Sequence, residues 1–254
     1  MGKVFIKSQR EIELMKESCR IVAEVLALVG SRIKPGAYTR DLDEIAERYI
    51  RSRGATPAFK GYGTDKRNLF PGTLCVSIED EVVHGIPNGR QLQEGQVISV
   101  DVGVKKDGYY GDGARTFAVG RVSEERMRLL RVTEESLYKG IEQAQEGKRL
   151  HDVSHAVQTH VEAAGFSVVR DLVGHGIGKS LHEEPAIPNY GAPGTGIKLK
   201  EGMVLAIEPM VNAGSARVSV GNDGWTVRTW DGKPSAHFEH TVVVRKGDAE
   251  ILTR

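Results

Sequence analysis

The spacing of apolar positions along the chain predicts four helices. The first begins near Ser8, which forms a capping-box pattern with Glu11, and its apolar residues then recur every three or four positions. Glycine and serine signals bound three further helical patterns, at residues 41–53, 123–144 and 150–164. Runs rich in β-branched and aromatic residues predict strands at residues 74–78, 97–104, 109–119, 168–173, 203–212, 225–229 and 237–246. This mixture predicts an α+β fold.

Two of these strands are predicted to form a hairpin that carries aspartates where apolar residues are expected. Asp107-Gly108 is a strong two-residue turn signal, so residues that face each other across the hairpin have numbers that sum to 215. Asp101 and Asp112 then become diagonal neighbours on one face. A three-residue loop would break this parity, and a solvent-facing Asp112 is the plainer alternative. Two buried carboxylates this close repel each other unless a cation or a proton lies between them.

An internal duplication organises the chain. In both halves a glycine is followed by an aspartate and then by a second glycine at equal spacings, at positions 36, 41 and 54 and again at 147, 152 and 165. The similar strand lead-ins LQEGQVISVD and LKEGMVLAIE end on Asp101 and Glu208. We therefore interpret residues 1–254 as one domain with a duplication at about 36–120 and 147–246. Its two α/β halves are expected to share a site between them.

Composition and charge exclude several classes of protein. The chain is 39% hydrophobic and 27% charged, with a net charge of +1, so it lacks the basic footprint of a nucleic-acid or membrane-surface binder. Its apolar stretch IVAEVLALVG is interrupted by Glu24 and is too short to span a bilayer. The two cysteines, Cys19 and Cys75, imply no disulfide framework. We expect a cytoplasmic protein with no membrane partner and no specific nucleic-acid partner.

Further acidic residues and a histidine extend the set of candidate metal ligands. Glu208 ends an apolar strand, and Glu239 lies in the predicted strand HFEHTVVV on the face shared with His237 and Thr241. His175 stands between glycines in VGHGIGKSLHEEP, where it either fills a turn or binds a ligand. This stretch lacks the first glycine of a P-loop, and the sequence has no H-E-x-x-H motif. Four converging carboxylates would be neutralised by two divalent cations and not by one, and they favour manganese or iron(II).

Three short motifs accompany these candidates: VVHGIP at 82–87, HGIGxxxHEEP at 175–185 and IEPM at 207–210. Together with the ordered set Asp101, Asp112, His175, Glu208 and Glu239, they resemble the type I methionine aminopeptidases over essentially the whole chain. The resemblance implies a pita-bread fold, with two pseudo-symmetric α/β halves around a central dinuclear metal site, and makes the whole chain one catalytic domain. The sequence shows no large extra N-terminal domain, which argues against prolidase and aminopeptidase P. Glu208 follows His182 by only 26 positions, which leaves no room for the insertion of type II enzymes.

The resemblance also implies an activity and roles for the ligands. The reaction would be removal of the initiator methionine from nascent proteins and peptides, preferring a small second residue, through a hydroxide that bridges two divalent ions (Mn, Fe, Co or Zn). Asp101 would chelate one ion, and Asp112 and Glu239 would bridge both. His175 and Glu208 would complete the other ion.

Other residues receive roles through the same resemblance. Glu208 would carry the proton, His182 would donate to the oxyanion, and His84 would donate to the scissile amide. Leu181 and Phe70 depart from residues common in the family, and Glu79 and Glu81 replace less charged residues, so no monovalent-ion site is predicted. By position, the methionine pocket is expected to contain Phe59, Tyr62, Phe70, Cys75 and Trp225.

The expected partners are the N-termini of nascent polypeptides. This function would bring the enzyme to the ribosome, although no residue indicates the contact, and nothing requires more than a monomer. Two alternatives are kept open: a prolidase- or aminopeptidase P-like hydrolase, and a binding protein that kept the fold and lost catalysis. The complete ligand set argues against the second.

Overall fold

All four predicted helices are present in residues 2–254, the part of the chain that this computed structural model describes. Their ends shift by a few residues from the predicted ones: α1 (Gln9–Gly30), α2 (Thr39–Ser52), α3 (Glu124–Ile141) and α4 (Leu150–Ala163). The capping box is confirmed, because the side chains of Ser8 and Glu11 each bind the other's backbone N–H. None of these helices combines the length and the apolar character needed to cross a bilayer.

The strands form three sheets. The largest has nine strands and follows the path β1 (Thr56–Pro57), β4 (Val97–Lys106), β5 (Tyr109–Ala118), β14 (Glu239–Val243), β9 (Val204–Ile207), β7 (Val173–Gly176) and β8 (Glu183–Pro188), with β2 (Leu74–Ile78) on β4 and β15 (Glu250–Ile251) on β14. One three-stranded sheet consists of β13 (Ser235–His237), β10 (Met210–Asn212) and β6 (Ser167–Val168). The other consists of β11 (Val218–Val220), β12 (Val227–Thr229) and β3 (Glu81–Val83).

The predicted hairpin is confirmed in its register as well as its strands. On β4 and β5, Asp101 faces Ala114 and Gly103 faces Asp112, so the parity that makes the two aspartates diagonal neighbours holds. The turn residues Asp107 and Gly108 have φ of 50° and 85°. Positive φ at both central positions is the requirement of a tight hairpin turn whose twist matches the strands.

Three predicted strands are broken in the structure. The stretch 203–212 divides at Pro209, which has no N–H to continue a ladder, so β9 stays in the large sheet and β10 enters a small one. The stretch 237–246 divides at Phe238, where β13 and β14 separate in the same way. The backbone N–H of Phe238 donates to the carbonyl oxygen of Pro209 at 3.3 Å, so the two breaks lie side by side. The predicted strand at 168–173 is also wrong, because only its two ends are extended, in β6 and β7.

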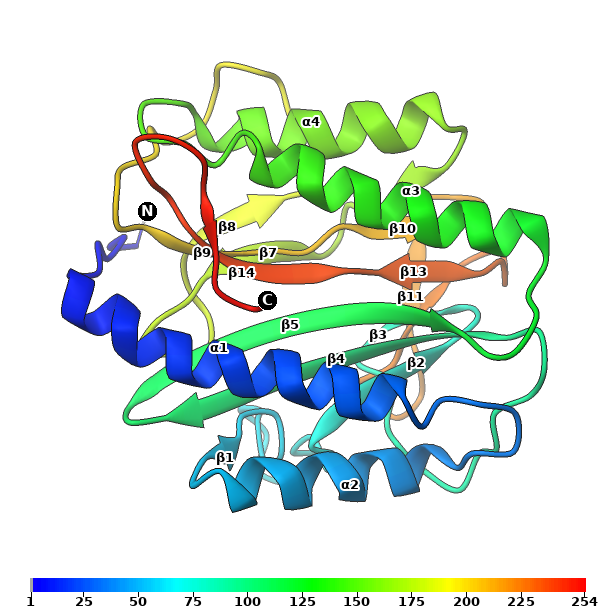
Figure 1. Cartoon of the computed structure of the whole chain (residues 1–254). Helices are drawn as coiled ribbons and strands as arrows, with labels where there is room; N and C mark the ends of the chain where they lie inside the picture. The colour runs from blue at the N-terminus through cyan, green and yellow to red at the C-terminus, as the bar shows by residue number, and fades with distance from the viewer. Residues whose placement is uncertain (1) are drawn as a thin grey trace.

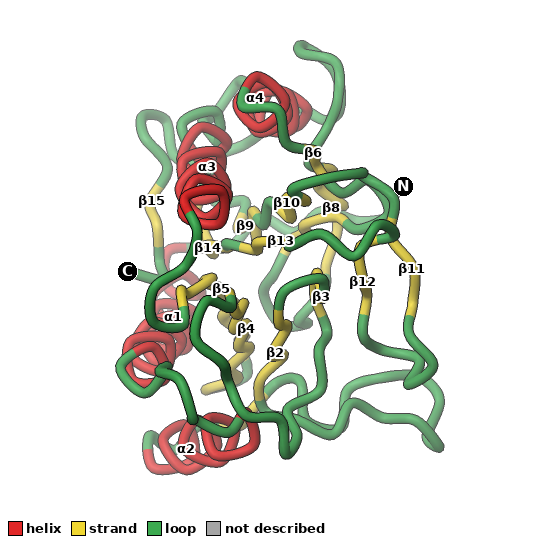
Figure 2. The backbone as a smooth tube through the Cα atoms, turned by 90° about the vertical axis from the view of Figure 1, so that its right-hand side faces the viewer, coloured by secondary structure: helices red, strands yellow, loops and turns green. Residues whose placement is uncertain are grey.

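The nine-stranded sheet joins two halves, each with its own apolar core. In Figure 1, α1 and α2 cross the lower half and α3 and α4 the upper half. Side chains of α1 and α2 pack with β2 and β4, whereas those of α3 and α4 pack with β9 and β14. The view in Figure 2 places α1 and α3 on one side of the strands and β11 and β12 on the other. The halves meet where β5 pairs with β14, through Ala114 with Glu239 and Gly113 with His240.

The positions matched by the predicted duplication adopt similar local structures. Helices α2 and α4 each have 14 residues. The glycines before them, Gly36 and Gly147, have φ of 88° and 93°, a left-handed conformation in which glycine carries no steric penalty. The division into one domain with an internal duplication stays a prediction that this similarity supports.

Candidate metal centre and active site

A single cavity brings together every side chain that the sequence predicted for the site. It lies between the two halves, because strands and loops of both contribute to its lining. Its lining includes the leucine that departs from the family pattern, Leu181. The predicted residues that line it are Asp101, Asp112, His175, Glu208, Glu239, His84, His182, Phe59, Tyr62, Phe70, Cys75 and Trp225.

Three carboxylates reach the cavity from adjacent strands of the large sheet. Asp101 is on β4, Asp112 is on β5 and Glu239 begins β14, and all three carboxylates are buried from solvent. Thr241, predicted on the same face as Glu239, secures this arrangement. Its hydroxyl donates to the backbone carbonyl oxygen of Asp112 at 2.7 Å and accepts the backbone N–H of Asp112 at 3.2 Å. The strand ladder therefore fixes where these carboxylates stand.

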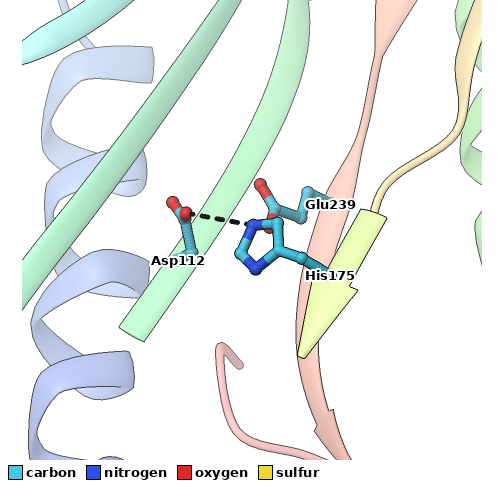
Figure 3. A group of neighbouring side chains, drawn as sticks. All are labelled: Asp112, His175 and Glu239. Atoms are coloured by element: carbon cyan, nitrogen blue, oxygen red, sulfur yellow. Dashed lines mark ion pairs between the residues drawn. The ribbon is translucent and has the colours of Figure 1, made fainter. Parts of the chain in front are cut away.

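His175 and Glu208, which belong to the same half as Glu239, complete the acidic and imidazole cluster. Nε2 of His175 lies 3.9 Å from Oδ2 of Asp112 and 3.6 Å from Oε1 of Glu208. Figure 3 shows Asp112, His175 and Glu239 pointing toward one another, and one ligand atom from each lies within 4.8 Å of the others. The neighbouring Gly174 is needed for this approach, because a Cβ there would lie 2.4 Å from the carbonyl oxygen of Ala206.

Burial sets the charges of this cluster. It raises the pKa of Asp112 to about 7 and the pKa values of Asp101, Glu208 and Glu239 well above their usual range, with repulsion between the carboxylates adding to the last three. Burial also lowers the pKa of His175 to about 3, so its imidazole is neutral at physiological pH. Without a cation the cluster therefore retains protons on its carboxyl groups.

The donor set fits divalent metal ions. Oδ1 of Asp101 and Oε1 of Glu239 are buried, and within residues 2–254 neither has a hydrogen-bond partner. Such oxygens are costly unless a cation or a proton satisfies them. Nδ1 of His175 lies 2.9 Å from the carbonyl oxygen of Gly176, so it carries the proton and leaves the lone pair of Nε2 facing the carboxylates. Oxygen ligands with one imidazole suit manganese, iron and related ions better than a thiolate-type zinc site.

The two remaining histidines come from loops. His84 follows β3 with φ of 59°, a left-handed conformation that is strained for a non-glycine residue. Its neighbour Gly85 packs directly on β2, where a Cβ would lie 2.1 Å from the carbonyl oxygen of Val76. Burial lowers the pKa of His84 to about 4 and also lowers the pKa of His182. Both rings are therefore neutral at physiological pH and each can donate one N–H.

The predicted methionine pocket forms the apolar part of the cavity. Phe70 and Trp225 pack edge to face with ring centroids 5.3 Å apart. Cys75 lies on β2 directly opposite Asp101, and burial raises the pKa of its thiol well above the usual value. The thiol is therefore uncharged and acts as a small apolar surface. Leu181, which packs in the same cluster, supplies an aliphatic wall.

One residue beside the cluster was not predicted as part of the site. Nε2 of His237 lies 3.5 Å from Oε2 of Glu208, and the ring is buried. Burial lowers its pKa to about 3, so it faces Glu208 as a neutral ring. The alternation of the strand placed His237 on the same face as Glu239, which was the available signal. The strand is interrupted at Phe238, and this interruption brings His237 next to Glu208. No periodicity in the sequence predicted that contact.

A second unpredicted feature supports the loop of His84. The carboxylate of Glu81 is buried and accepts from Arg90 at 2.5 Å, from Arg228 at 2.6 Å and from the backbone N–H of Ile78 at 2.9 Å. Charge-assisted bonds of this kind are stronger than neutral ones. They tie the start of the His84 loop to β12, the strand that follows Trp225.

Comparison with known proteins places this geometry in context. The sequence model of metallopeptidase family M24 matches residues 13–246. A Bacillus subtilis protein named methionine aminopeptidase 1 is 53% identical over 251 residues, which cover 99% of each chain. The crystal structure of methionine aminopeptidase from Thermotoga maritima has a TM-score of 0.96 at 47% identity and covers 99% of this chain and 100% of that one.

A more distant structure shares the fold alone. The prolidase from Pyrococcus furiosus has a TM-score of 0.77 at 23% identity and covers 98% of this chain and 65% of its own. These likenesses confirm the predicted α+β pita-bread fold.

Proposed function

The chain belongs to metallopeptidase family M24, and we propose that it is a methionyl aminopeptidase that removes the initiator methionine from nascent proteins and peptides. One observation carries the proposal: the acidic and histidine cluster and the apolar pocket line a single cavity. Full-length relatives named methionine aminopeptidase support it. A small second residue would be preferred, because the predicted site sets both histidines close to the bond that follows the methionine.

We propose that the cluster holds two divalent metal ions. Asp112 and Glu239 would bridge them, and Asp101 would chelate one. His175 and Glu208 would complete the other. Two such ions offset four carboxylate charges, and manganese, iron, cobalt and zinc are the candidates. When bound, they would polarise the scissile carbonyl and lower the pKa of a water molecule so that it can act as the nucleophile.

Glu208 would carry the proton of the reaction. Its carboxyl group is buried beside His175 and His237. A carboxylate in this position can take a proton from water and return it to the leaving amine. The neutral ring of His237 would leave that proton on Glu208.

Two neutral imidazoles would stabilise the reacting amide. His182 would donate an N–H to the oxygen that gains negative charge, which is the position where a fixed donor lowers the barrier most. His84 would donate to the scissile amide nitrogen or carbonyl. The strained backbone of His84 and the buried Glu81 beneath its loop would hold this donor in place.

The methionine side chain would occupy the apolar end of the cavity. Phe59, Phe70 and Trp225 supply aromatic surface, and Cys75 and Leu181 supply softer walls. An unbranched thioether adapts to such a pocket better than a β-branched side chain does. We further propose that the enzyme acts in the cytoplasm as a monomer on chains that emerge from the ribosome.

A direct assay tests the function. The protein is incubated with the peptide Met-Ala-Ser and Mn(II), Co(II) or Fe(II), and free methionine is measured. We expect cleavage that EDTA stops and that added metal restores. Leu-Ala-Ser and an Xaa-Pro peptide are the matched controls and should be cleaved far more slowly.

Two outcomes would count against this function. Full turnover in EDTA would remove the metal ions from the reaction. Preferential cleavage of the Xaa-Pro peptide would favour the prolidase- or aminopeptidase P-like alternative.

A further inference from the structure

We propose that Tyr62 is a positioning residue that fixes which nitrogen of His182 carries the proton. Its hydroxyl oxygen lies 2.7 Å from Nδ1 of His182, and the two rings are 5.3 Å apart at 59°. The sequence suggested Tyr62 only as a wall of the methionine pocket. The inference deepens the proposed function and rests on it, because the reaction uses His182 as a donor.

The chemistry of the two groups sets the direction of this hydrogen bond. A phenol is a stronger donor than a neutral imidazole N–H, and an imidazole nitrogen is a stronger acceptor than a phenol oxygen. The two atoms lie at hydrogen-bond distance, and a phenol keeps its proton at neutral pH. Tyr62 therefore donates to Nδ1, and the only ring proton of His182 is on Nε2.

This tautomer is the one that the reaction needs from His182. A neutral imidazole has one N–H, and a ring that carried it on Nδ1 would spend it on Tyr62. With Nδ1 occupied by the Tyr62 hydroxyl, Nε2–H is free for a group bound in the cavity that His182 lines. The partner of one imidazole nitrogen thus decides what the other nitrogen can do.

The backbone around Tyr62 holds the hydroxyl in place. The N–H of Tyr62 donates to the carbonyl oxygen of Phe59 at 2.8 Å, and the N–H of Phe70 donates to the carbonyl oxygen of Tyr62 at 2.9 Å. A further bond from the N–H of Gly61 to the carbonyl oxygen of Phe70, at 2.8 Å, closes the base of the loop 61–70. Tyr62 is therefore anchored even though the loop tip extends toward solvent.

The tip of the loop 61–70 is hydrogen-bonded to the segment that contains Asp223 and Trp225. The side-chain amide of Asn68 donates to the carbonyl oxygen of Asp223 at 3.1 Å, and the indole N–H of Trp225 donates to the carbonyl oxygen of Asn68 at 3.2 Å. One loop thus links the pocket residue Trp225 to the partner of His182.

The kinetic test compares Tyr62→Phe with the wild-type protein, using Met-Ala-Ser and saturating Mn(II). The ring that lines the pocket stays, and only the hydroxyl is lost. We expect kcat to fall about 10- to 100-fold, as for other residues that orient a functional imidazole, with KM changed by less than about threefold. Tyr38→Phe is the matched control, because Tyr38 is exposed and does not line the cavity, and it should retain wild-type kcat.

A double-mutant cycle separates positioning from pocket lining. In a His182→Ala background, Tyr62→Phe should have no further effect on kcat, because the residue acts through the missing ring. Equal losses in both backgrounds, or a wild-type kcat in Tyr62→Phe alone, would overturn the assignment.

Nitrogen-15 NMR of the histidine rings gives a readout that does not depend on activity. In the full chain with Zn(II) added, His182 should show an unprotonated Nδ1 and a protonated Nε2, and Tyr62→Phe should show a mixture. A proton on Nδ1 in the wild-type protein contradicts the inference whether or not the peptide is cleaved. Absence of cleavage with the expected tautomer would instead reject the proposed function alone.

Discussion

The cavity has an inner wall made of strands and an outer rim made of loops, and the two are built in different ways. On the wall, Asp101, Asp112 and Glu239 stand on three neighbouring strands, and the register of the strand ladder determines their spacing. On the rim, His84 and Tyr62 are held by individual contacts with side chains and turns. The wall therefore holds carboxyl groups at positions set by the strands, whereas contacts within the rim determine how its neutral side chains are oriented.

The two regions also differ in what they cost the folded protein. The wall buries carboxyl groups whose charged forms are disfavoured until a cation arrives. The rim carries neutral rings that already have partners, as in the pairing of the exposed side chains of Tyr62 and His182. Substitutions in the wall should therefore lower activity while they raise the stability of the metal-free protein. Substitutions in the rim should lower activity without that gain in stability.

The largest effect is expected from Asp112→Asn. Loss of a proposed metal ligand should lower kcat/KM by at least ~10³-fold, because metal-ion catalysis supplies several kcal/mol. In EDTA at about pH 8 the same variant should be more stable than the wild type by roughly 1–4 kcal/mol, since it removes a buried charge. Urea unfolding measures this difference. Glu134→Gln, at a half-buried position that does not line the cavity, should change neither quantity. A less stable Asp112→Asn would contradict this explanation.

A rim substitution should give a smaller loss without a gain in stability. His182→Ala is expected to lower kcat by about 10²–10³-fold, as for removal of an oxyanion donor. The free energy of unfolding of the metal-free variant should not show the increase that is expected of Asp112→Asn. A near-normal rate would remove His182 from the mechanism.

The wall should also couple metal binding to pH. Asp112, with a pKa of about 7 when no metal is bound, holds a proton below that pH and must release it to bind a cation. Apparent metal affinity should therefore fall as pH decreases, by about tenfold per pH unit for each proton released. Calorimetry at about pH 6 and about pH 8 in buffers of different ionisation enthalpy measures the release. An affinity that did not change with pH would show that the carboxyl groups are already ionised.

The smallest effect is expected at the loop tip. Asn68→Ala removes the side-chain bond to Asp223 but leaves the base of the loop intact. We expect kcat/KM to fall by only about two- to fivefold, in line with the loss of one neutral hydrogen bond. Arg67→Ala, at an exposed neighbouring position, is the control. A loss as large as that of Tyr62→Phe would mean that the tip, and not the base, positions the hydroxyl.

The sequence predicted the wall better than the rim, for a physical reason. Strand pairing is governed by a period of two, so one turn signal at Asp107-Gly108 sufficed to place Asp101 and Asp112 correctly. The paired breaks at Pro209 and Phe238 were missed, because a change of sheet is decided by packing between distant segments. The bond from Tyr62 to His182 spans 120 positions in the chain, and no local pattern encodes it. The family resemblance assigned both residues to the site but did not predict that they contact each other.

The pairing of β5 with β14 has a consequence for the synthesis of the protein itself. Asp101 and Asp112 are synthesised before Glu239, which lies on a strand that inserts between two strands made before it. Until then, β5 and β9 each lack a neighbour, and exposed edges of this kind invite pairing with other chains. The carboxylates of the cluster can therefore come together only after β14 has been synthesised, and a chaperone that shields those edges would act before that point.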